Sequence, residues 1–263
     1  MKIRDVTGYL ETIAPSELQE SYDNAGLIVG DPATEVTGVL TSLDCTEAIV
    51  EEAAARGCNL VVAHHPIVFR GLKRLNGANY VERTVIRAIQ LGVAIYAIHT
   101  NLDNVRDRGV NERIAQQLEL ENLRLLRAKN EAGTVGSGMV GELPEPMSET
   151  AFLSMLRERM QAEVVRHTTL LNKEVTTVAV AGGAGGFLLE DAKRAGAQVF
   201  VTADYKYHEF FDADGQIVIC DIGHYESEQF TTQLLAEVLS TKFTTFAVLS
   251  TELITNPVHY FVG

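Results

Sequence analysis

The sequence predicts an α/β protein made of two α/β domains, and two observations support that fold class. Short apolar runs, which are typical of buried strands, alternate over the first 120 residues with segments whose apolar residues recur at helical spacing. This order favours a largely parallel sheet covered by helices. From about residue 131, glycines and prolines accumulate and a second series of strands and helices follows, so we place a domain boundary near 125–130.

The first domain is predicted to alternate helices and strands in a regular order. Apolar residues at helical spacing predict helices over 2–13, 47–56, 79–91 and about 110–119. Pro15 ends the first of them, and Thr46 is suited to cap the second. Apolar runs predict strands over 36–43, 60–63 and 93–98, with a turn and a short strand over 22–30.

The second domain repeats this make-up less regularly. Helices are predicted over 148–160, from the glycine-rich stretch 182–186 to Ala195, within 203–213 and over 225–240. Strands are predicted over 163–168, 175–181, 198–201, 217–220 and 244–249. The glycine-rich stretch 182–186 follows a strand and opens a helix, which is the context of a phosphate-binding turn. It fits neither G-x-G-x-x-G nor a P-loop, so a tight strand-to-helix turn is favoured.

Composition excludes several classes of protein. The 263 residues are 46% hydrophobic and 22% charged, as expected of a soluble globular enzyme. The net charge of −13 argues against a general nucleic-acid binder, since phosphate contacts need clustered Lys and Arg. The three cysteines are widely spaced and odd in number, which favours a reducing cytoplasm over a disulfide framework. We see no signal peptide and no apolar run of the roughly 18 residues that a membrane span needs.

Candidate metal ligands follow two of the predicted strands. Strand 60–63 leads into His64 and His65, and Pro66 then stops it. Neighbouring side chains of an extended chain point to opposite sides, so we expect these histidines to serve two ions, one each. His99 and Asp103 follow strand 93–98. Ligands bind at the carboxyl ends of strands in parallel sheets, so these residues are expected to meet there.

A second pair of candidate ligands lies late in the chain. His224 and Glu228 are four residues apart at a predicted helix start, so both side chains lie on one helical face. Taken alone, this pair is commonest on solvated helices, and two adjacent histidines are commonest as satisfied core residues. Together, His64, His65, Asp103, His224 and Glu228 make up enough ligands for two ions if Glu228 bridges them. Imidazole with carboxylate suits Zn, Fe, Mn, Co or Ni, and the sequence does not choose among them.

Three motifs carry a resemblance to a known family. They are His64-His65-Pro66, His99-Thr100-Asn101-Leu102-Asp103 and Gly223-His224-Tyr225-Glu226-Ser227-Glu228. They are similar to those of the GTP cyclohydrolase I type 2 family, also described as the Nif-three-like family of dinuclear metal proteins. Segments 22–27 and 202–208 resemble further family blocks, so the resemblance covers nearly the whole chain.

The resemblance implies a ligand set and an architecture. Its pattern places His65 and Asp103 on one divalent ion, His64 and His224 on the other, and Glu228 on both. It implies two domains with mixed sheets flanked by helices, in the short form that lacks a long middle insertion. Residues 1–127 with 222–263 would form the metal-binding domain, and 128–221 the second domain. The resemblance also implies a homohexameric ring. Ala203 stands where the family has glycine, which removes the residue best suited to a positive φ.

The function expected is that of a metal-dependent hydrolase. A hydroxide bridging two divalent ions would attack an electrophilic carbon, with the metals stabilising the oxyanion charge. The resemblance suggests GTP as substrate, with opening of the purine imidazole ring at C8 and release of formate. The alternatives are a ring-forming adaptor or metal carrier without catalysis, and a phosphoesterase or nuclease acting on small acidic substrates.

Further residues are assigned around this reaction. Glu228 and His99 are the expected catalytic residues, although a structural role for His99 is an equal alternative. His208 with Tyr207, and Arg70 beside Lys73 and Arg74, are the expected substrate contacts, to be weighed against a hydrogen-bonded helix start and a solvated face. No cysteine has an evident base and no serine lies in G-x-S-x-G, so a nucleophilic side chain is disfavoured.

Overall fold

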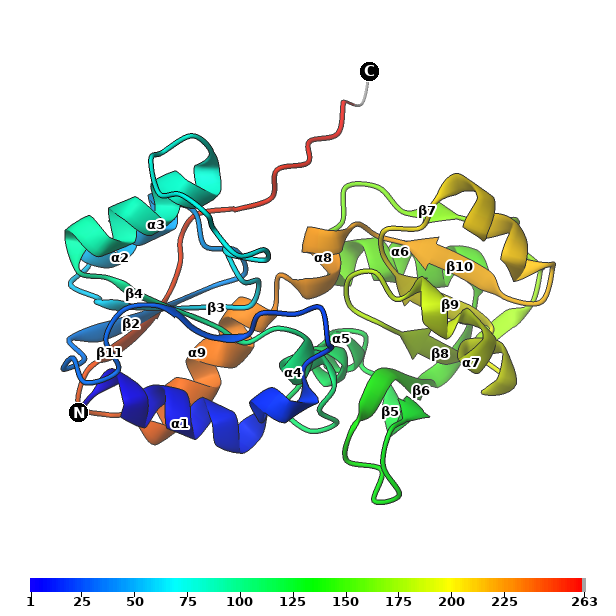
Figure 1. Cartoon of the computed structure of the whole chain (residues 1–263). Coiled ribbons are helices and arrows are strands. Elements are labelled where there is room, and N and C mark those ends of the chain that lie inside the picture. Colours follow the sequence, from blue (N-terminus) through cyan, green and yellow to red (C-terminus); the bar gives the residue numbers. More distant parts are fainter. Residues whose placement is uncertain (262–263) are drawn as a thin grey trace. The chain divides into compact units, whose positions relative to one another are not determined.

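The computed structural model describes residues 1–261, which divide into two compact units (Figure 1). Unit 1 consists of Met1–Leu102 and Thr231–Pro257, and unit 2 of Asp103–Phe230 and residues 258–261. The sequence-based boundaries fell instead at 127/128 and 221/222. The difference arises because residues 103–127 contribute a helix and most of an edge strand to unit 2. Asp103, His224 and Glu228 therefore belong to unit 2, whereas His64 and His65 belong to unit 1.

Unit 1 is built on a mixed five-stranded sheet in the order β1-β4-β3-β2-β11. The strands are β1 (Gly26–Val29), β2 (Gly38–Ser42), β3 (Leu60–Ala63), β4 (Ala94–Ala97) and β11 (Ala247–Ser250). Strands β4, β3, β2 and β11 run parallel, and β1 joins β4 antiparallel. The strands predicted over 36–43, 60–63 and 93–98 are thus confirmed within two residues at each end, and β11 is the last segment of the chain returning to this sheet.

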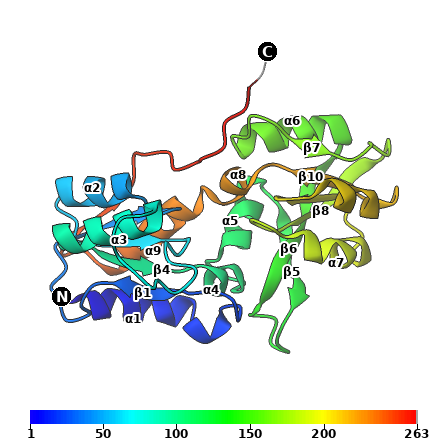
Figure 2. The same ribbon diagram turned by 45° about the horizontal axis from the view of Figure 1, so that its top comes forward.

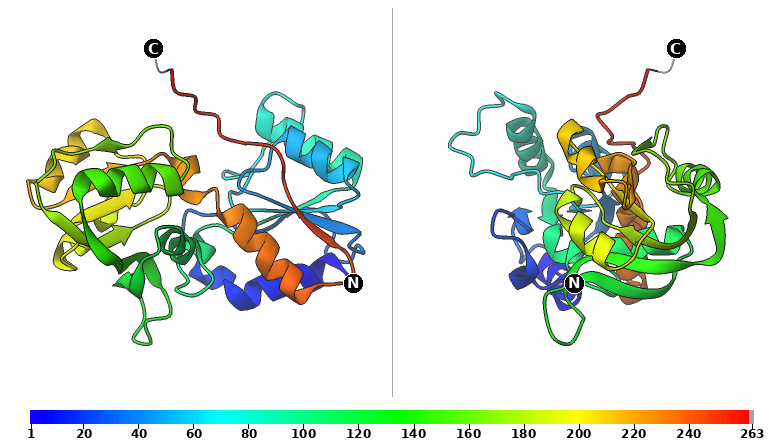
Figure 3. Two further views of the ribbon diagram at one scale, coloured as in Figure 1. Left: turned by 180° about the vertical axis from the view of Figure 1, so that it is seen from behind. Right: turned by 90° about the vertical axis from the view of Figure 1, so that its right-hand side faces the viewer.

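Helices cover both faces of this sheet. They are α1 (Ile3–Ile13), the 3-10 turn η1 (Ser16–Leu18), α2 (Glu47–Ala55), α3 (Tyr80–Leu91) and α9 (Thr231–Lys242). Helices α2 and α3 lie over one face, and α1 and α9 over the other (Figures 1 and 3). The Thr46 hydroxyl accepts a hydrogen bond from Ile49 N and caps α2, as predicted. The fully buried Leu40, Ile49, Val61 and Ile95 belong to the core between the sheet and α2 and α3.

Unit 2 is built on a mixed six-stranded sheet in the order β5-β6-β8-β9-β10-β7. Its strands are β5 (Glu121–Ala128), β6 (Gly136–Ser148), β7 (Arg166–His167), β8 (Glu174–Val180), β9 (Val199–Thr202) and β10 (Val218–Asp221). Strands β8, β9 and β10 run parallel, and the others pair antiparallel. The sequence reading missed β5, because most of this edge strand is exposed or half-buried and it lacks a clear alternation.

The helices of unit 2 are shorter than predicted. They are α5 (Val110–Gln117), α6 (Glu149–Arg159), the 3-10 turn η2 (Gly186–Leu188), α7 (Leu189–Arg194), the 3-10 helix η3 (Tyr207–Ala213) and α8 (His224–Glu228). A short helix that was not predicted, α4 (Thr100–Asp103), has residues 100–102 in unit 1 and Asp103 in unit 2. Helix α6 lies over one face of the sheet and α7 over the other (Figure 2). None of the helices among residues 1–261 combines the length and the hydropathy needed to cross a membrane.

One predicted helix is wrong. The segment 225–240 is not continuous, because α8 ends at Glu228 and α9 begins at Thr231. The two helices belong to different units, and α9 packs on β2 and β11. At the break, the Gln229 side chain donates to Met160 O in unit 2 (2.9 Å). Helical periodicity across the break reports that both segments are amphipathic, not that they are collinear.

Candidate metal centre

His64 and His65 lie in a bend directly after β3, which ends at Ala63. Their backbone N–H groups donate to Ser42 O (3.1 Å) and Leu43 O (2.9 Å), which fixes the bend against the end of β2. The premise that both histidines lie in extended chain is therefore wrong. Their ring centroids are 4.9 Å apart, and the two side chains offer ring nitrogens within 4.8 Å of one another.

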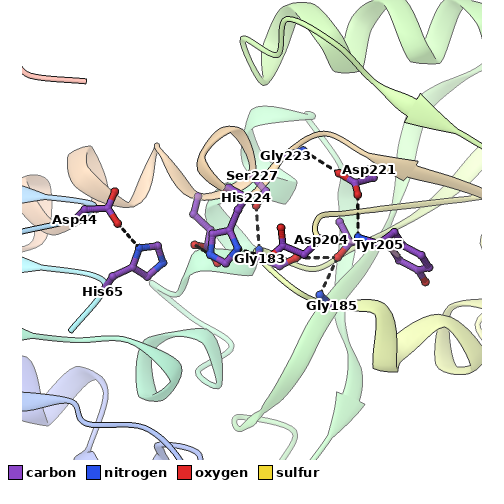
Figure 4. A network of polar contacts seen from close by, with 12 residues as sticks. Asp44, His65, Gly183, Gly185, Asp204, Tyr205, Asp221, Gly223, His224 and Ser227 are labelled. Atoms are coloured by element: carbon purple, nitrogen blue, oxygen red, sulfur yellow. Dashed lines mark hydrogen bonds and ion pairs between the residues drawn. The ribbon is translucent and has the colours of Figure 1, made fainter. Parts of the chain in front are cut away.

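His64, His65 and the neighbouring His99 each have Nδ1 in contact with an oxygen of unit 1. His64 Nδ1 lies 2.8 Å from Ile98 O, His65 Nδ1 lies 2.8 Å from Asp44 Oδ1, and His99 Nδ1 lies 2.7 Å from Asp23 Oδ1. The Asp44–His65 bond is drawn in Figure 4. A carbonyl oxygen accepts only, so Nδ1 of His64 carries the proton and its lone pair lies on Nε2.

The two carboxylates that hold His65 and His99 are ionised. Burial raises the pKa of Asp23, but hydrogen bonds from His99 and Thr100 outweigh it and lower that pKa to about 2. Burial likewise raises the pKa of Asp44, and the hydrogen bond from His65 together with its charge brings it below the ordinary value. Ionised carboxylates accept from Nδ1–H and orient the ring, which is the usual support of a metal-ligating histidine.

In unit 2, α8 begins at His224, and two residues separate it from the end of β10. His224 Nε2 lies 3.1 Å from Glu228 Oε2, so the expected i,i+4 pair forms on one helical face. Its Nδ1 lies 2.8 Å from Asp204 Oδ2, the same support that the other histidines have (Figure 4). Asp204 adopts a left-handed conformation with φ of 59°, and Ala203 does not. The turn therefore forms without a glycine at position 203, because the residue with positive φ is the one after it.

The charge state of His224 follows from its two carboxylate neighbours. Burial lowers the pKa of His224, but the hydrogen bonds to Asp204 and Glu228 outweigh it and raise that pKa to about 11. The metal-free imidazole is therefore protonated and lies between two carboxylates. A cation at Nε2 would displace that proton, so the same arrangement suits a metal ligand.

Asp103 and Glu228 complete the ligand group of unit 2. Asp103 ends α4, and the two side chains offer oxygens within 4.8 Å of one another. Asn111 on α5 links the segment that carries Asp103 to the glycine-rich turn 182–186. Its Nδ2 donates to Asp103 O (3.0 Å), and its Oδ1 accepts from Gly182 N (3.0 Å). Glu228 thus contacts His224 and also offers an oxygen close to one of Asp103.

The glycine-rich turn 182–186 lies against these ligands. It is a tight turn between β8 and η2, as favoured. A Cβ at Gly183 would lie 2.6 Å from Glu228 Oε1 and 3.1 Å from His224 Cε1, and one at Gly182 would lie 3.2 Å from the same oxygen. Gly183 also has φ of 59°. Its N–H donates to Ser227 Oγ (3.0 Å), which attaches the turn to α8. These glycines therefore make room for the carboxylate and the imidazole.

Asp221 holds the two loops that carry Asp204 and His224. Its side chain is 3% exposed and accepts from Tyr205 N (2.9 Å, Oδ2) and from Gly223 N (3.1 Å, Oδ1) (Figure 4). Arg166 on β7 forms an ion pair with the same carboxylate. The sequence analysis did not identify Asp221 as a site residue. Its position at the end of β10 was the one available signal.

The remaining predicted site residues are exposed and do not join these clusters. Arg70 lies in the loop after β3, and no acidic side chain among residues 1–261 pairs with it. Tyr207 and His208 lie at the start of η3 with ring centroids 5.1 Å apart, and no group of candidate ligands in the described chain includes His208. The three cysteines are buried, and burial raises the pKa of each thiol, which keeps them unreactive at neutral pH.

The donor chemistry fits a divalent transition metal. Imidazole nitrogens and carboxylate oxygens are the available donors, and each histidine that would bind through Nε2 has its Nδ1 held by an oxygen. The histidine and glutamate clusters are thus consistent with metal binding. Of the five expected ligands, two lie in unit 1 and three in unit 2.

Comparison with known proteins agrees with this fold. The chain is 34% identical over 240 residues to a GTP cyclohydrolase 1 type 2 homolog of Lactococcus lactis, covering 91% of each protein. A homolog of the same name from Staphylococcus epidermidis is 26% identical over 367 residues, covering 99% of this chain and 100% of that protein. That alignment exceeds the 263 residues of this chain, so this relative carries additional residues.

Among solved structures, a hypothetical protein from Staphylococcus aureus has 30% identity and a TM-score of 0.91, covering 99% of both chains. It shares the α/β architecture with its two mixed sheets. The family described as Duf34/NIF3 (NGG1p interacting factor 3) matches residues 1–257, which include both units and all five expected ligands. On the length of that match and the agreement in fold, the chain belongs to the Duf34/NIF3 family.

Proposed function

We propose that the protein is a metal-dependent hydrolase in which His64, His65, Asp103, His224 and Glu228 hold two divalent ions. The observation that carries this proposal is common to all three histidines. In each, an oxygen acceptor fixes Nδ1, so that a metal would bind at Nε2. In this assignment His65 and Asp103 hold one ion, His64 and His224 hold the other, and Glu228 is shared.

The chain would contribute orientation and charge to the reaction. When bound, two such ions supply Lewis acidity and lower the pKa of a shared water toward neutrality. Asp44 and Asp204 hold the rings of His65 and His224 in one orientation. Gly182 and Gly183 keep side chains away from the Glu228 carboxylate. The His99–Asp23 pair suits an imidazole that transfers a proton, although a ligating role fits the same contacts.

The proposed substrate is a nucleotide such as GTP, whose purine imidazole ring would be opened at C8 with release of formate. The names of the relatives support this choice. Arg70, Lys73 and Arg74 are exposed in the loop after β3, and among the described residues they have no acidic partner. They are therefore available for an anionic group. Tyr207 and His208 are the other proposed substrate contacts, and both side chains are exposed.

Metal analysis combined with a GTP consumption assay tests the proposal. The purified protein should contain about two divalent ions per chain. Glu228→Ala should lower both the metal content and the activity, because it removes the shared ligand. Glu158→Ala, which changes an exposed glutamate of α6, should alter neither. A wild-type protein that binds no divalent ion would exclude the metal centre. Two bound ions without turnover of any nucleotide would favour a metal carrier.

A further inference from the structure

Unit 1 contains a third histidine, His99, beside His64 and His65. In the proposed five-ligand centre, His99 is not a metal ligand. His99 follows β4, which pairs in parallel with β3 so that Ala63 lies opposite Ala97. The ring centroids of His64, His65 and His99 form a triangle with sides of 4.9, 5.2 and 5.4 Å. Each side chain offers one ring nitrogen within 4.8 Å of the other two.

In each of the three rings, Nδ1 is the nitrogen that contacts an oxygen of unit 1. The Nδ1 atoms of His64, His65 and His99 are held by Ile98 O, Asp44 Oδ1 and Asp23 Oδ1, at 2.8, 2.8 and 2.7 Å. A metal bound through Nε2 therefore leaves these three contacts in place. Three nitrogens bound to one zinc at about 2.0–2.1 Å are roughly 3.4 Å from one another in tetrahedral geometry. Small rotations of rings this close can bring the three Nε2 atoms to that spacing.

The surroundings of this triangle fix the rings from several sides. His64 and His65 are held by backbone hydrogen bonds to the end of β2. The carboxylate that supports His99 also accepts from Thr100 N (3.0 Å), and Thr255 Oγ1 donates to the one that supports His65 (2.6 Å). The ring of Phe69 closes another side, with its centroid 5.7 Å from that of His99. Every one of these groups belongs to unit 1.

We propose that unit 1 by itself holds one divalent transition-metal ion through Nε2 of His64, His65 and His99. Three imidazoles with a further open position are a recurrent zinc-binding arrangement, and the same donors suit Co or Ni. His99 is then a metal ligand, and an ion can be captured before any carboxylate of unit 2 takes part. The site uses two residues of the five-ligand centre but does not require that centre to exist.

The test uses the full-length chain without the donors of unit 2. A triple variant, Asp103→Ala with His224→Ala and Glu228→Ala, is titrated with Co²⁺ and followed by the visible absorption of the bound ion. One ion per chain is expected. Adding His99→Ala should weaken binding by more than the roughly 10–100-fold that loss of an outer-shell partner costs. Adding His167→Ala, an exposed histidine of β7, should leave binding unchanged and serves as the matched control.

X-ray absorption gives a readout that does not depend on the His99 variant folding. The triple variant loaded with one Zn²⁺ per chain should show three imidazole ligands at about 2.0–2.1 Å. Binding that is insensitive to His99→Ala, with fewer than three imidazoles on the ion, overturns the proposal. If the triple variant binds no ion while the wild type does, the three-histidine site is excluded and the proposed hydrolase centre stands. If neither protein binds an ion, both proposals fail.

Discussion

At the scale of single residues, the site depends on oxygens that fix imidazole rings. Asp44, Asp204 and the carbonyl of Ile98 each accept from Nδ1 of an expected ligand histidine. Such partners set the tautomer and the ring orientation, and so determine which nitrogen is available to a metal. Asp204 does this from a left-handed backbone conformation, which aspartate tolerates better than most residues. The strain is thus placed at a residue with a defined contact.

Replacing Asp204 by asparagine should weaken metal binding. Asparagine keeps the shape and the tolerance of positive φ, but it removes the charge that holds His224 Nδ1–H. We expect a loss of affinity of about 10–100-fold, measured by competition with a chromophoric chelator. Asp214→Asn is the matched control, because Asp214 also has a positive φ, of 48°, but ends η3 on the surface. Equal affinities of the two variants would show that Asp204 does not position the ligand.

Replacing Gly183 by alanine should damage the same site through sterics. The new Cβ would lie 2.6 Å from Glu228 Oε1, a distance at which the carboxylate or the turn must move. Gly133 provides a control with matched backbone strain, because its φ is 62° and a Cβ there would meet no atom within 4 Å. We expect Gly183→Ala to lose metal in inductively coupled plasma mass spectrometry. Gly133→Ala should retain its metal. Equal metal contents in the two variants would show that the Glu228 carboxylate does not need the space left by Gly183.

At the scale of elements, polar side chains attach segments that are far apart in sequence. Asp221 at the end of β10 joins the loops before η3 and α8 through Tyr205 N and Gly223 N. Glu52 on α2 does the same in unit 1 for the segment after β11. It accepts from Glu252 N (2.9 Å), from Arg56 Nη1 (2.6 Å) and from the Thr251 hydroxyl. These contacts hold the returning end of the chain on the first sheet.

The Glu52 contacts should make part of the stability depend on pH. Burial raises the pKa of Glu52, but the hydrogen bonds from Thr251, Glu252 and Arg56 outweigh it and lower that pKa below 4.5. A lowered carboxyl pKa stabilises the fold above the unfolded-state pKa, and this contribution is lost as pH falls through the folded-state pKa. We expect Glu52→Gln to lower the free energy of unfolding by about 1.5–3 kcal/mol at pH 7.

Urea denaturation of wild type and Glu52→Gln measures this effect. The difference between them should shrink as the pH is lowered below about 4.5, toward the folded-state pKa. Glu51→Gln is the control, since the neighbouring Glu51 forms only a surface pair with Arg87 and its side chain is 55% exposed. Its substitution should have little effect at either pH. A pH-independent difference for Glu52→Gln would contradict the assignment.

At the scale of the whole molecule, the chain crosses between its units more than once, and the proposed ligands come from both. Residues 1–102 build most of unit 1, residues 103–230 build unit 2, and α9 with β11 returns to the first sheet. The segment 251–261 that follows has no helix or strand and exposes Ile254, Val258 and Phe261, which are 79%, 54% and 98% accessible. Exposed apolar side chains in one segment favour burial against another protein surface.

We therefore expect self-association, and the family resemblance implies a hexamer. Size-exclusion chromatography with light scattering should give a mass about six times that of the 28.8 kDa chain. Ile254→Asp should shift the population toward smaller species, because it places a charge in the segment expected to be buried. Ile89→Asp changes another exposed isoleucine, on α3 and 60% accessible, and should not shift the population. A wild-type mass of a single chain would contradict this expectation.

Much of the fold and part of the site can be predicted from local sequence. The apolar run of β3, the Thr46 cap of α2 and the spacing of His224 and Glu228 are signals between residues close in the chain. The edge strand β5 and the break between α8 and α9 could not be predicted in this way. The first depends on pairing with β6, and the second on packing in two different units.

The sequence by itself determined the α/β class, the strand that presents His64 and His65, and the residue types that can bind a metal. Only the tertiary structure decided which nitrogen each histidine offers. The acceptor of His99 lies 76 residues away, that of His65 21 and that of His224 20. No fixed spacing links these pairs, because each hydrogen bond forms between loops that the sheets bring together. The tertiary structure also decided that His99 lies beside His64 and His65, because β3 pairs in parallel with β4.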